Sequence, residues 1–219
     1  MNKKHILFIF IFSINYCFGQ SDNANQNAKY KQVTDINDYE NIAIINKVED
    51  SEGLFKIGHV SASSSGIKMF NSKEDLQKKT FIKLKMVGAL MGASVIRIPN
   101  MQIKNKEYAV DWDRSQELAG TAYSLTPLDF DAFAKLLGDK SEYFSISGTE
   151  LGFNSTNFSN RDKTIKINIA SLKKEDNAII IKGKLHGDEG KYQVVYFDSE
   201  SFDVFYMDRA GSYRIKFKL

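Results

Sequence analysis

Few residues in this sequence have the types and spacing that chemistry requires. His186 stands close to Asp188 and Glu189, and imidazole together with carboxylates is a metal-binding combination. Asp188 and Glu189 also belong to a Gly-Asp-Glu-Gly stretch, which is typical of a hairpin turn. Ser65 and Lys68 match the Ser-x-x-Lys motif of penicillin-recognising enzymes, but the Lys-Thr-Gly partner motif does not occur. The sequence therefore predicts no catalytic residue, no metal site and no cofactor.

Two further patterns have a structural explanation. Gly88 and Gly92 lie at the end of an expected helix, where carbonyl groups point outward, so they favour close packing and a helix end over phosphate binding. Asp111, Asp113 and Ser115 place oxygens at alternate positions, as a calcium loop does. Such a loop needs glycine at its sixth position and glutamate at its twelfth, and this stretch has neither there.

Two loops are the candidates for contact with a partner. The loop Thr149–Asp162 mixes aromatic with amide side chains, and such loops suit carbohydrate or peptide because rings stack and amides hydrogen-bond. A long, solvated hairpin loop is the alternative interpretation. The single tryptophan lies in the second loop. The contact-surface candidates are Phe153, Asn154, Asn157, Phe158 and Trp112.

Residues 1–19 predict an export signal. Lys3 and Lys4 precede the apolar run Ile6–Ile14, and small residues follow before Gln20. The apolar run is shorter than the roughly 20 residues that span a bilayer. Lipidation at Cys17 is the alternative to cleavage before Gln20 and would anchor the chain to a membrane. We expect a protein of the periplasm or the secreted fraction, or alternatively an outer-membrane lipoprotein.

Composition excludes several classes of protein. The 219 residues include one cysteine, so no disulfide can form within the chain. Removal of the signal takes that cysteine and two lysines, and the net charge falls from +3 to +1. A nearly neutral chain has no general electrostatic basis for binding nucleic acid. Thiol catalysis and thiolate metal sites also lose their sulfur atom.

The elements that would position these residues form an α+β protein. Polar residues 20–37 predict a flexible linker, and residues 38–138 an α/β domain with one long and one short helix. The long helix begins at Asn71 or Ser72 and ends at Gly92, and the short one runs from Thr126 to Leu137. In this domain we expect strands at 41–48, 54–62, 93–98 and 117–125, and a loop at 61–66.

The period of the hydrophobic pattern changes to two after residue 139. Ile165, Ile167 and Ile169 alternate with polar residues, and the same alternation runs from Tyr213 to Leu219. Residues 139–219 therefore predict an antiparallel meander of five or six strands, with turns at 187–190 and 208–211.

One stretch of the first domain resembles a known group of proteins. The run Gly88-Ala89-Leu90-Met91-Gly92-Ala93-Ser94-Val95-Ile96, with Gly120-Thr121-Ala122-Tyr123, resembles small bacterial envelope domains such as the Rcs-pathway outer-membrane lipoprotein. The resemblance covers about residues 82–123 and contains no catalytic residue. The disulfides of that lipoprotein are absent, so only an α/β domain in the cell envelope is implied. The Cys-Phe-Gly-Gln junction resembles secretory signals of the Bacteroidota.

These observations predict a non-catalytic, secreted cell-envelope accessory or interaction protein. Its expected partner is an envelope protein or a glycan, not nucleic acid, and it would contact a membrane only if Cys17 is lipidated. The alternatives are a carrier of a lipid or another small apolar ligand in a β-sheet cavity, and a hydrolase whose site the sequence does not reveal.

Overall fold

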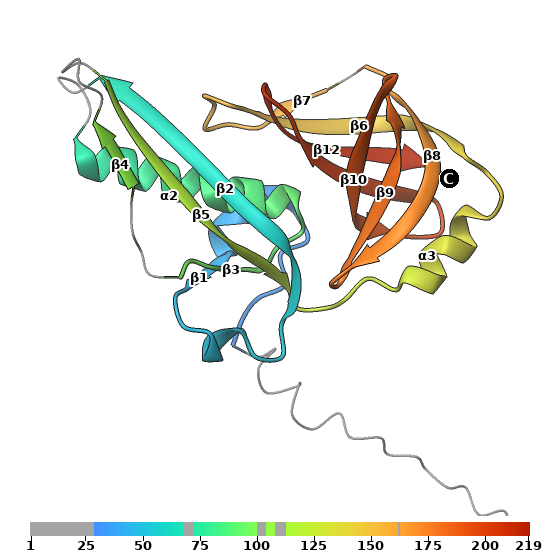
Figure 1. Ribbon diagram of the computed structural model, residues 1–219, viewed down its shortest axis with the longest axis horizontal. Coiled ribbons are helices and arrows are strands. Elements are labelled where there is room, and N and C mark those ends of the chain that lie inside the picture. The colour runs from blue at the N-terminus through green and yellow to red at the C-terminus, as the bar shows by residue number, and fades with distance from the viewer. Residues whose placement is uncertain (1–28, 68–71, 100–103, 108–112, 162) are drawn as a thin grey trace, which may run out of the picture.

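A computed structural model describes residues 29–67, 72–99, 104–107, 113–161 and 163–219. Two parts stand side by side, a sheet with a long helix and a sheet that closes into a barrel (Figure 1). The predicted α+β class and the C-terminal antiparallel meander are confirmed. The signal segment, Cys17 and Trp112 lie outside the described residues.

The first sheet combines short and long strands. Its strands are β1 (Ala43–Ile45), β2 (Phe55–Ile67), β3 (Val95–Arg97), β4 (Lys104–Glu107) and β5 (Asp113–Ser124). The order is β1–β3–β5–β2, and β4 also pairs with β5. The 3-10 helices η1 (Ile36–Asn41) and η2 (Glu49–Ser51) flank β1. Only the β1–β3 pair is parallel among these described strands.

Two boundaries in this part differ from the sequence-based expectation. The loop predicted at 61–66 is wrong, because this segment continues β2 and pairs with β5, for example Ser63 with Glu117. The long strand β5 offers main-chain hydrogen-bonding groups along this whole segment, and the small side chains of residues 61–66 do not prevent the two strands from pairing. Val33, which falls in the predicted linker, is buried, and its amide donates to the Ser94 hydroxyl at 3.1 Å.

Helix α2 (Lys73–Leu90) has the start and the end that the sequence predicts. The Ser72 hydroxyl accepts from the amide of Asp75 at 3.0 Å, which caps the first turn. Gly92 has a φ of +76°, the left-handed conformation that commonly ends a helix. A Cβ atom at Gly88 would lie 2.8 Å from Ile96, so glycine there permits the helix to pack closely on β3.

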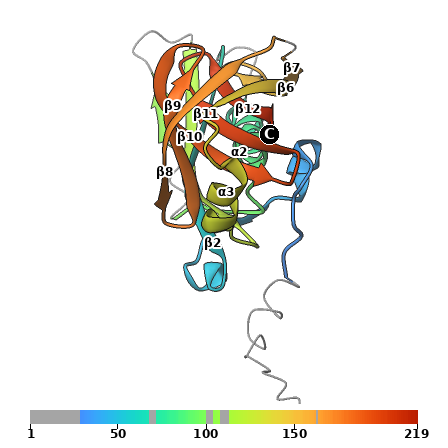
Figure 2. The same ribbon diagram turned by 90° about the vertical axis from the view of Figure 1, so that its right-hand side faces the viewer.

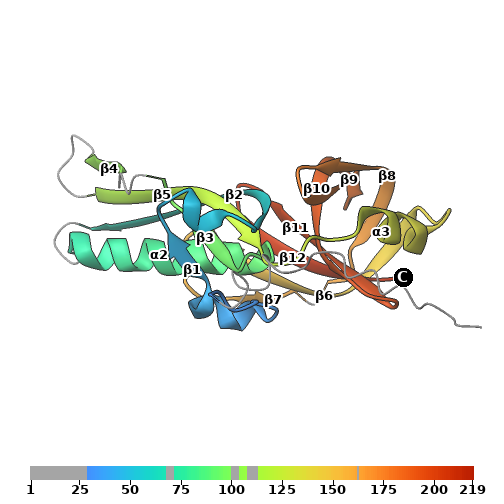
Figure 3. The same ribbon diagram turned by 90° about the horizontal axis from the view of Figure 1, so that it is seen from below.

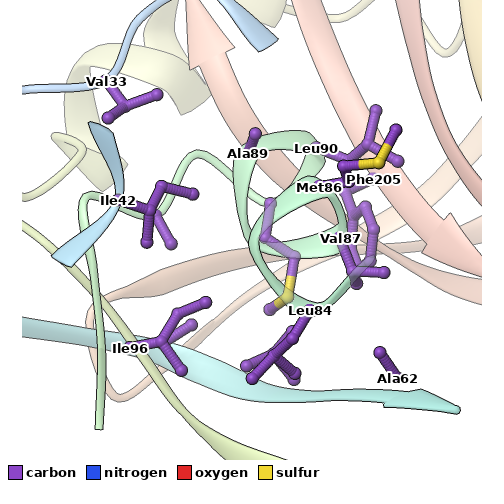
Figure 4. Close-up of a cluster of buried hydrophobic side chains, with 14 of the residues drawn as sticks. Val33, Ile42, Ala62, Leu84, Met86, Val87, Ala89, Leu90, Ile96 and Phe205 are labelled. Carbon is purple, nitrogen blue, oxygen red and sulfur yellow. The ribbon is translucent and has the colours of Figure 1, made fainter. Parts of the chain in front are cut away.

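The core around α2 draws residues from both parts of the molecule. In Figure 4 the apolar side of the helix lies between Ile96 of β3, Ile42 and Phe205 of the barrel. Leu84 and Leu90 of the helix have no exposed surface. Figure 3 shows the helix running below the first sheet and reaching the barrel with its C-terminal half. The barrel therefore covers one side of α2.

The second sheet closes on itself. Its strands are β6 (Glu142–Gly152), β7 (Ser159–Asn160), β8 (Lys166–Glu175), β9 (Ala178–Leu185), β10 (Asp188–Phe197), β11 (Ser201–Met207) and β12 (Gly211–Lys218). They follow the order β12–β11–β10–β9–β8–β6–β7, and β12 also pairs with β6. Figure 2 shows these strands wrapping around a common axis. Closure removes the two free edges of the sheet.

The turn between β9 and β10 is shorter than predicted. The expected turn at 187–190 is wrong, because Asp188, Glu189 and Gly190 already pair within β10. The turn consists of His186 and Gly187, which have φ values of 58° and 98°. Two consecutive positive φ angles are the requirement of a two-residue hairpin with a type I′ turn.

Helix α3 (Phe130–Leu137) belongs to the core of the barrel. The Asp129 carboxylate caps it by accepting from the amide of Ala132 at 3.0 Å, so the predicted start at Thr126 is wrong by one turn. Thr126 and Asp129 are both of the types that favour a helix N-cap, and the structure uses Asp129. Phe133 is fully buried there.

Large side chains fill the inside of the barrel. Near the start of β11, Phe202 contacts the rings of Tyr143 and Phe217, at centroid distances of 5.1 and 5.4 Å. Near the end of β11, Tyr206 stacks on Tyr213 at 4.7 Å, and burial raises the pKa of Tyr206 to about 12. The Arg161 guanidinium covers the Tyr213 ring at 4.9 Å. The barrel axis is thus occupied by packed rings.

Candidate functional site

A small cavity lies where the barrel meets the first part, and we call it the junction pocket. Its volume is about 180 Å³. The first part contributes residues of β2, α2 and β5, and the barrel contributes the end of β6 and the turn between β11 and β12. The residues that matter below are Lys83, Glu117, Phe153, Met207 and Asp208.

Helix geometry places Lys83 on the covered side of α2. Thr80 precedes it by three residues and Val87 follows it by four, so the three side chains share one helix face. Thr80 and Val87 are buried, and Lys83 itself is only 6% exposed. The residues covering this face include Leu151 of the barrel, which belongs to the same core cluster as Val87. The amphipathic packing of α2 therefore draws a lysine into a buried position.

Among the described residues, Lys83 has neither a hydrogen bond nor an ion pair, and its one polar contact is with a ring. Its Nζ atom lies 5.1 Å from the centroid of the Phe153 ring. Burial lowers the pKa of Lys83 because the charged ammonium loses water. A cation–π contact contributes on the order of 1 kcal/mol, which does not replace the three hydrogen bonds that an ammonium makes in water. Lys83 lines the junction pocket, and its Nζ atom is not one of the fully buried, unpaired polar atoms of the described residues.

Among the described residues, the other buried charged side chain belongs to Asp203 of the barrel, and it has a partner. Asp203 on β11 is also buried, but Arg214 of β12 donates to it at 2.8 Å. Burial raises the pKa of Asp203, and the neighbouring guanidinium opposes that shift. Buried charges in folded proteins are ordinarily paired in this way. Lys83 departs from that rule.

The acids beside the pocket are engaged elsewhere or lie toward solvent. Asp208 accepts hydrogen bonds from the amides of Ala210 and Gly211, at 2.7 and 3.0 Å, and so stabilises its own turn. Glu117 is an exposed residue of β5. Neither carboxylate forms an ion pair with Lys83. The ammonium thus keeps its capacity to bind an anion.

Two large apolar side chains stand at the rim of the pocket. Phe153 is 57% exposed and Met207 is 48% exposed, although both line the same cavity. The backbone of Phe153 is held in place, because its amide donates to the carbonyl of Ala210 at 2.7 Å. A cation at the base and apolar groups at the rim can receive a ligand that carries one anionic group and an adjoining apolar group.

The predicted contact residues separate into different places. Phe153 lies at the pocket, whereas Phe158 packs edge-to-face on Tyr39 at 6.1 Å. Asn154 and Asn157 are exposed in the β6–β7 loop. Trp112 and Cys17 lie outside the described residues. Of the predicted contact residues that the structure describes, Phe153 alone lines the junction pocket.

Sequence reasoning missed Lys83. The signal was present, because a helical projection places this lysine among Thr80, Leu84 and Val87 on the apolar side of α2. The sequence could not indicate which side chains from the barrel cover this face of the helix. Phe153 lies 70 positions further along the chain and reaches Lys83 only after the barrel has closed.

A second hollow lies on the outside of the barrel, across β8, β9 and β10, and we call it the outer groove. Its volume is about 710 Å³, and Lys182, Lys184 and Lys191 are among its lining residues. Lys184 forms an ion pair with Glu189 at 3.4 Å, and both side chains are largely exposed. Exposed ion pairs of this kind contribute little to the stability of the folded protein.

Other site classes receive no support from the described residues. Within them, no group of three or more histidine, cysteine, aspartate or glutamate side chains is placed to hold a metal ion. None of the helices in this part of the chain combines the length and the hydropathy needed to cross a bilayer. Comparison with protein-family models, with curated proteins and with solved structures finds no match for this chain.

Proposed function

We propose that this protein is a non-catalytic interaction protein of the cell envelope that binds a partner protein through the junction pocket. The pocket takes up a carboxylate side chain of the partner, and Phe153 and Met207 contact the apolar residue beside it. The observation that carries this proposal is Lys83, a buried ammonium without an ionic partner among the described residues, at the base of an open cavity.

Binding energy is available at this position. A carboxylate that enters the pocket forms charge-assisted hydrogen bonds with the Lys83 ammonium and restores the interactions that burial removed. Phe153 and Met207 offer apolar area that is exposed in the free protein. An anchor residue in a central pocket with apolar neighbours is the usual composition of a binding hot spot.

The dimensions of the pocket support a side-chain anchor rather than a whole small molecule. A volume of about 180 Å³ is below the range of about 300–1,000 Å³ in which small-molecule ligands are usually held. Catalysis by a lysine would in addition require an acid or base beside it, and Asp208 is engaged by two amides of its own turn. These features favour recognition.

The alternative of a carrier has less support. A carrier of this fold would hold its ligand inside the barrel, and the rings of Phe202, Tyr143 and Phe217 occupy that space. Arg161 and Tyr206 close the same interior near the other end of β11. Export, and with it an envelope location, rests on residues 1–19 and is part of the proposal.

Titration with short peptides tests this function. Acetyl-Leu-Glu amide and its neutral analogue acetyl-Leu-Gln amide are added to the protein, and the backbone amides of Phe153 and Lys83 are followed by NMR. We expect the acidic peptide to bind with a dissociation constant on the order of 1 mM and the neutral one at least tenfold more weakly.

Two variants make the test specific. Lys83→Met keeps the length of the side chain and removes its charge, so binding of the acidic peptide should be lost. Lys85→Met is the matched control, because Lys85 lies on the same helix and donates to the Glu40 carbonyl at 2.9 Å instead of facing the pocket. Equal binding of both peptides, or unchanged binding by Lys83→Met, would refute the proposal.

A further inference from the structure

The outer face of the barrel carries two large apolar side chains that nothing in the described structure covers. Phe144 is 54% exposed and Ile146 is 58% exposed, and both lie on β6. Their neighbour Tyr143 points into the barrel and is buried. Single exposed apolar residues are common, but an adjoining pair on one strand indicates a contact surface.

Strand register places lysines on both sides of this pair. Lys166 of β8 lies directly opposite Phe144, and directly opposite residues of antiparallel strands face the same side. On β12, Phe217 pairs with Ser145, so Lys218 stands beside Phe144 at the next position. Lys166 bonds to Glu142 at 3.1 Å, and Lys218 forms no ion pair with any described residue. The apolar pair is therefore flanked by cationic side chains on both neighbouring strands.

The outer groove continues this surface. Glu142 and Asn168 pair with each other two positions from the Phe144–Lys166 pair, and both line the groove. Beyond them stand its lysines, Lys182, Lys184 and Lys191. Lys184 forms an ion pair with Glu189 at 3.4 Å and Lys191 forms one with Glu175 at 3.5 Å, and the lysine side chains of both pairs are exposed. Asn168 lines the groove, although its side-chain Oδ1 atom is buried and has no hydrogen-bond partner among the described residues. A hollow of about 710 Å³, with three lysines and two glutamates in its lining, thus adjoins an exposed apolar pair.

We infer that this face docks on an anionic phospholipid surface. Phe144 and Ile146 enter the boundary between headgroups and acyl chains, while the lysines of the outer groove take up phosphate headgroups. The two halves of the surface match the two halves of an amphiphile, because the exposed apolar pair fits the acyl region and the lysines around it fit anionic headgroups. Long lysine side chains suit the arrangement because their stems lie along apolar groups while the ammonium stays at the headgroups.

This docking is independent of the junction pocket and of lipidation at Cys17. It requires neither Lys83 nor an acyl chain, and it is weak enough to be reversible, as expected for a few lysines and two inserted side chains. Attraction between lysines and anionic headgroups falls as the ionic strength rises. Binding should therefore decrease from low to physiological salt.

Vesicle sedimentation tests the inference. The protein is mixed with vesicles of phosphatidylcholine alone or of phosphatidylcholine with 30% phosphatidylglycerol, and the bound fraction is measured. We expect partitioning to be at least tenfold greater with the anionic vesicles. The double variant Phe144→Ser/Ile146→Ser should lose about tenfold of that partitioning, and Lys182→Gln/Lys184→Gln/Lys191→Gln should lose a similar amount at low salt.

Controls separate the possible outcomes. Phe153→Ser removes an equally exposed phenylalanine at the junction and should bind vesicles as the wild type does. Soluble glycerol phosphate at millimolar concentration should compete poorly, because it lacks the surface that the apolar pair enters. Equal partitioning to both vesicle types, unchanged partitioning of the double serine variant, or full competition by glycerol phosphate would overturn the inference, the last in favour of a soluble phosphate ligand. Absence of any vesicle binding would also overturn it.

Discussion

The barrel buries its core among its own strands and α3, whereas the first sheet buries part of its core against the barrel. The barrel cluster around Phe202 contains residues from α3 and from β6 to β12 and the segments that join them. The cluster around α2 includes Leu151 and Phe205, which belong to the barrel. One part of the molecule is complete by itself and the other depends on its neighbour. The junction pocket lies at the boundary between the two parts, where the barrel covers the core around α2.

This difference has a chemical consequence. A self-contained barrel can be packed with apolar rings, and its buried charge Asp203 has Arg214 as a partner. The shared boundary instead traps Lys83, because the helix face that must be covered includes one lysine. Sites for recognition commonly arise where two structural units meet, since neither unit alone determines what is buried there.

The largest expected effect is on independent folding. Residues 126–219, which contain α3 and the barrel, should fold alone, because their core is internal. Residues 29–125 should not, because α2 would expose its covered face. Thermal unfolding followed by circular dichroism distinguishes the two, with a cooperative transition expected only for the barrel segment. A cooperative transition in both segments would remove the asymmetry.

A single substitution on the barrel tests the same dependence at smaller scale. Phe205 is 6% exposed and points from β11 toward the core around α2. Phe205→Ala should lower the free energy of unfolding by about 3 kcal/mol, the range in which truncation of a buried phenylalanine falls. Hydrogen exchange should show the loss chiefly in α2 and β2. Denaturant unfolding measures the total, and a loss confined to the barrel strands would contradict the dependence.

The sequence predicts the local features of this fold and misses those that depend on distant segments. Alternation at Ile165 and Ile167 predicts β8, and the cap at Ser72 predicts the start of α2, because both signals lie within a few residues. Closure of the barrel requires β12 to pair with β6, whose paired residues lie 59 to 72 positions earlier, and no local pattern specifies that pairing.

The candidate site divides in the same way. Phe153 is recognisable from the sequence because aromatic residues in a polar loop are unusual. Lys83 is not, because its burial is decided by the side chains that cover it from the barrel. Ser63 was expected in a loop for a related reason, since its strand pairing is supplied by β5 about 50 residues later.

The smallest expected effect concerns Lys83 and has the opposite sign. Lys83→Met should stabilise the protein by about 1–2 kcal/mol at pH 7, because it replaces a buried, unpaired ammonium with an apolar side chain of similar length. Lys85→Met, which removes a hydrogen bond to Glu40, should be neutral or destabilising. A residue kept for stability would behave in the reverse manner, so denaturant unfolding of the two variants separates a functional lysine from a structural one.

The pH dependence sharpens this last prediction. Burial lowers the pKa of Lys83 from its ordinary value of 10.5, so between the lowered value and 10.5 the unfolded chain binds more protons than the folded protein. The free energy of unfolding therefore rises with pH across that interval. Below the interval Lys83 is charged in the folded protein, and the whole destabilisation by its buried charge is present. The advantage of Lys83→Met over the wild type should be greatest near neutral pH and should vanish as the pH approaches 10.5. A difference that stays constant over this range would show that the substitution acts through packing, and would remove the electrostatic basis for placing recognition at the boundary between the two parts.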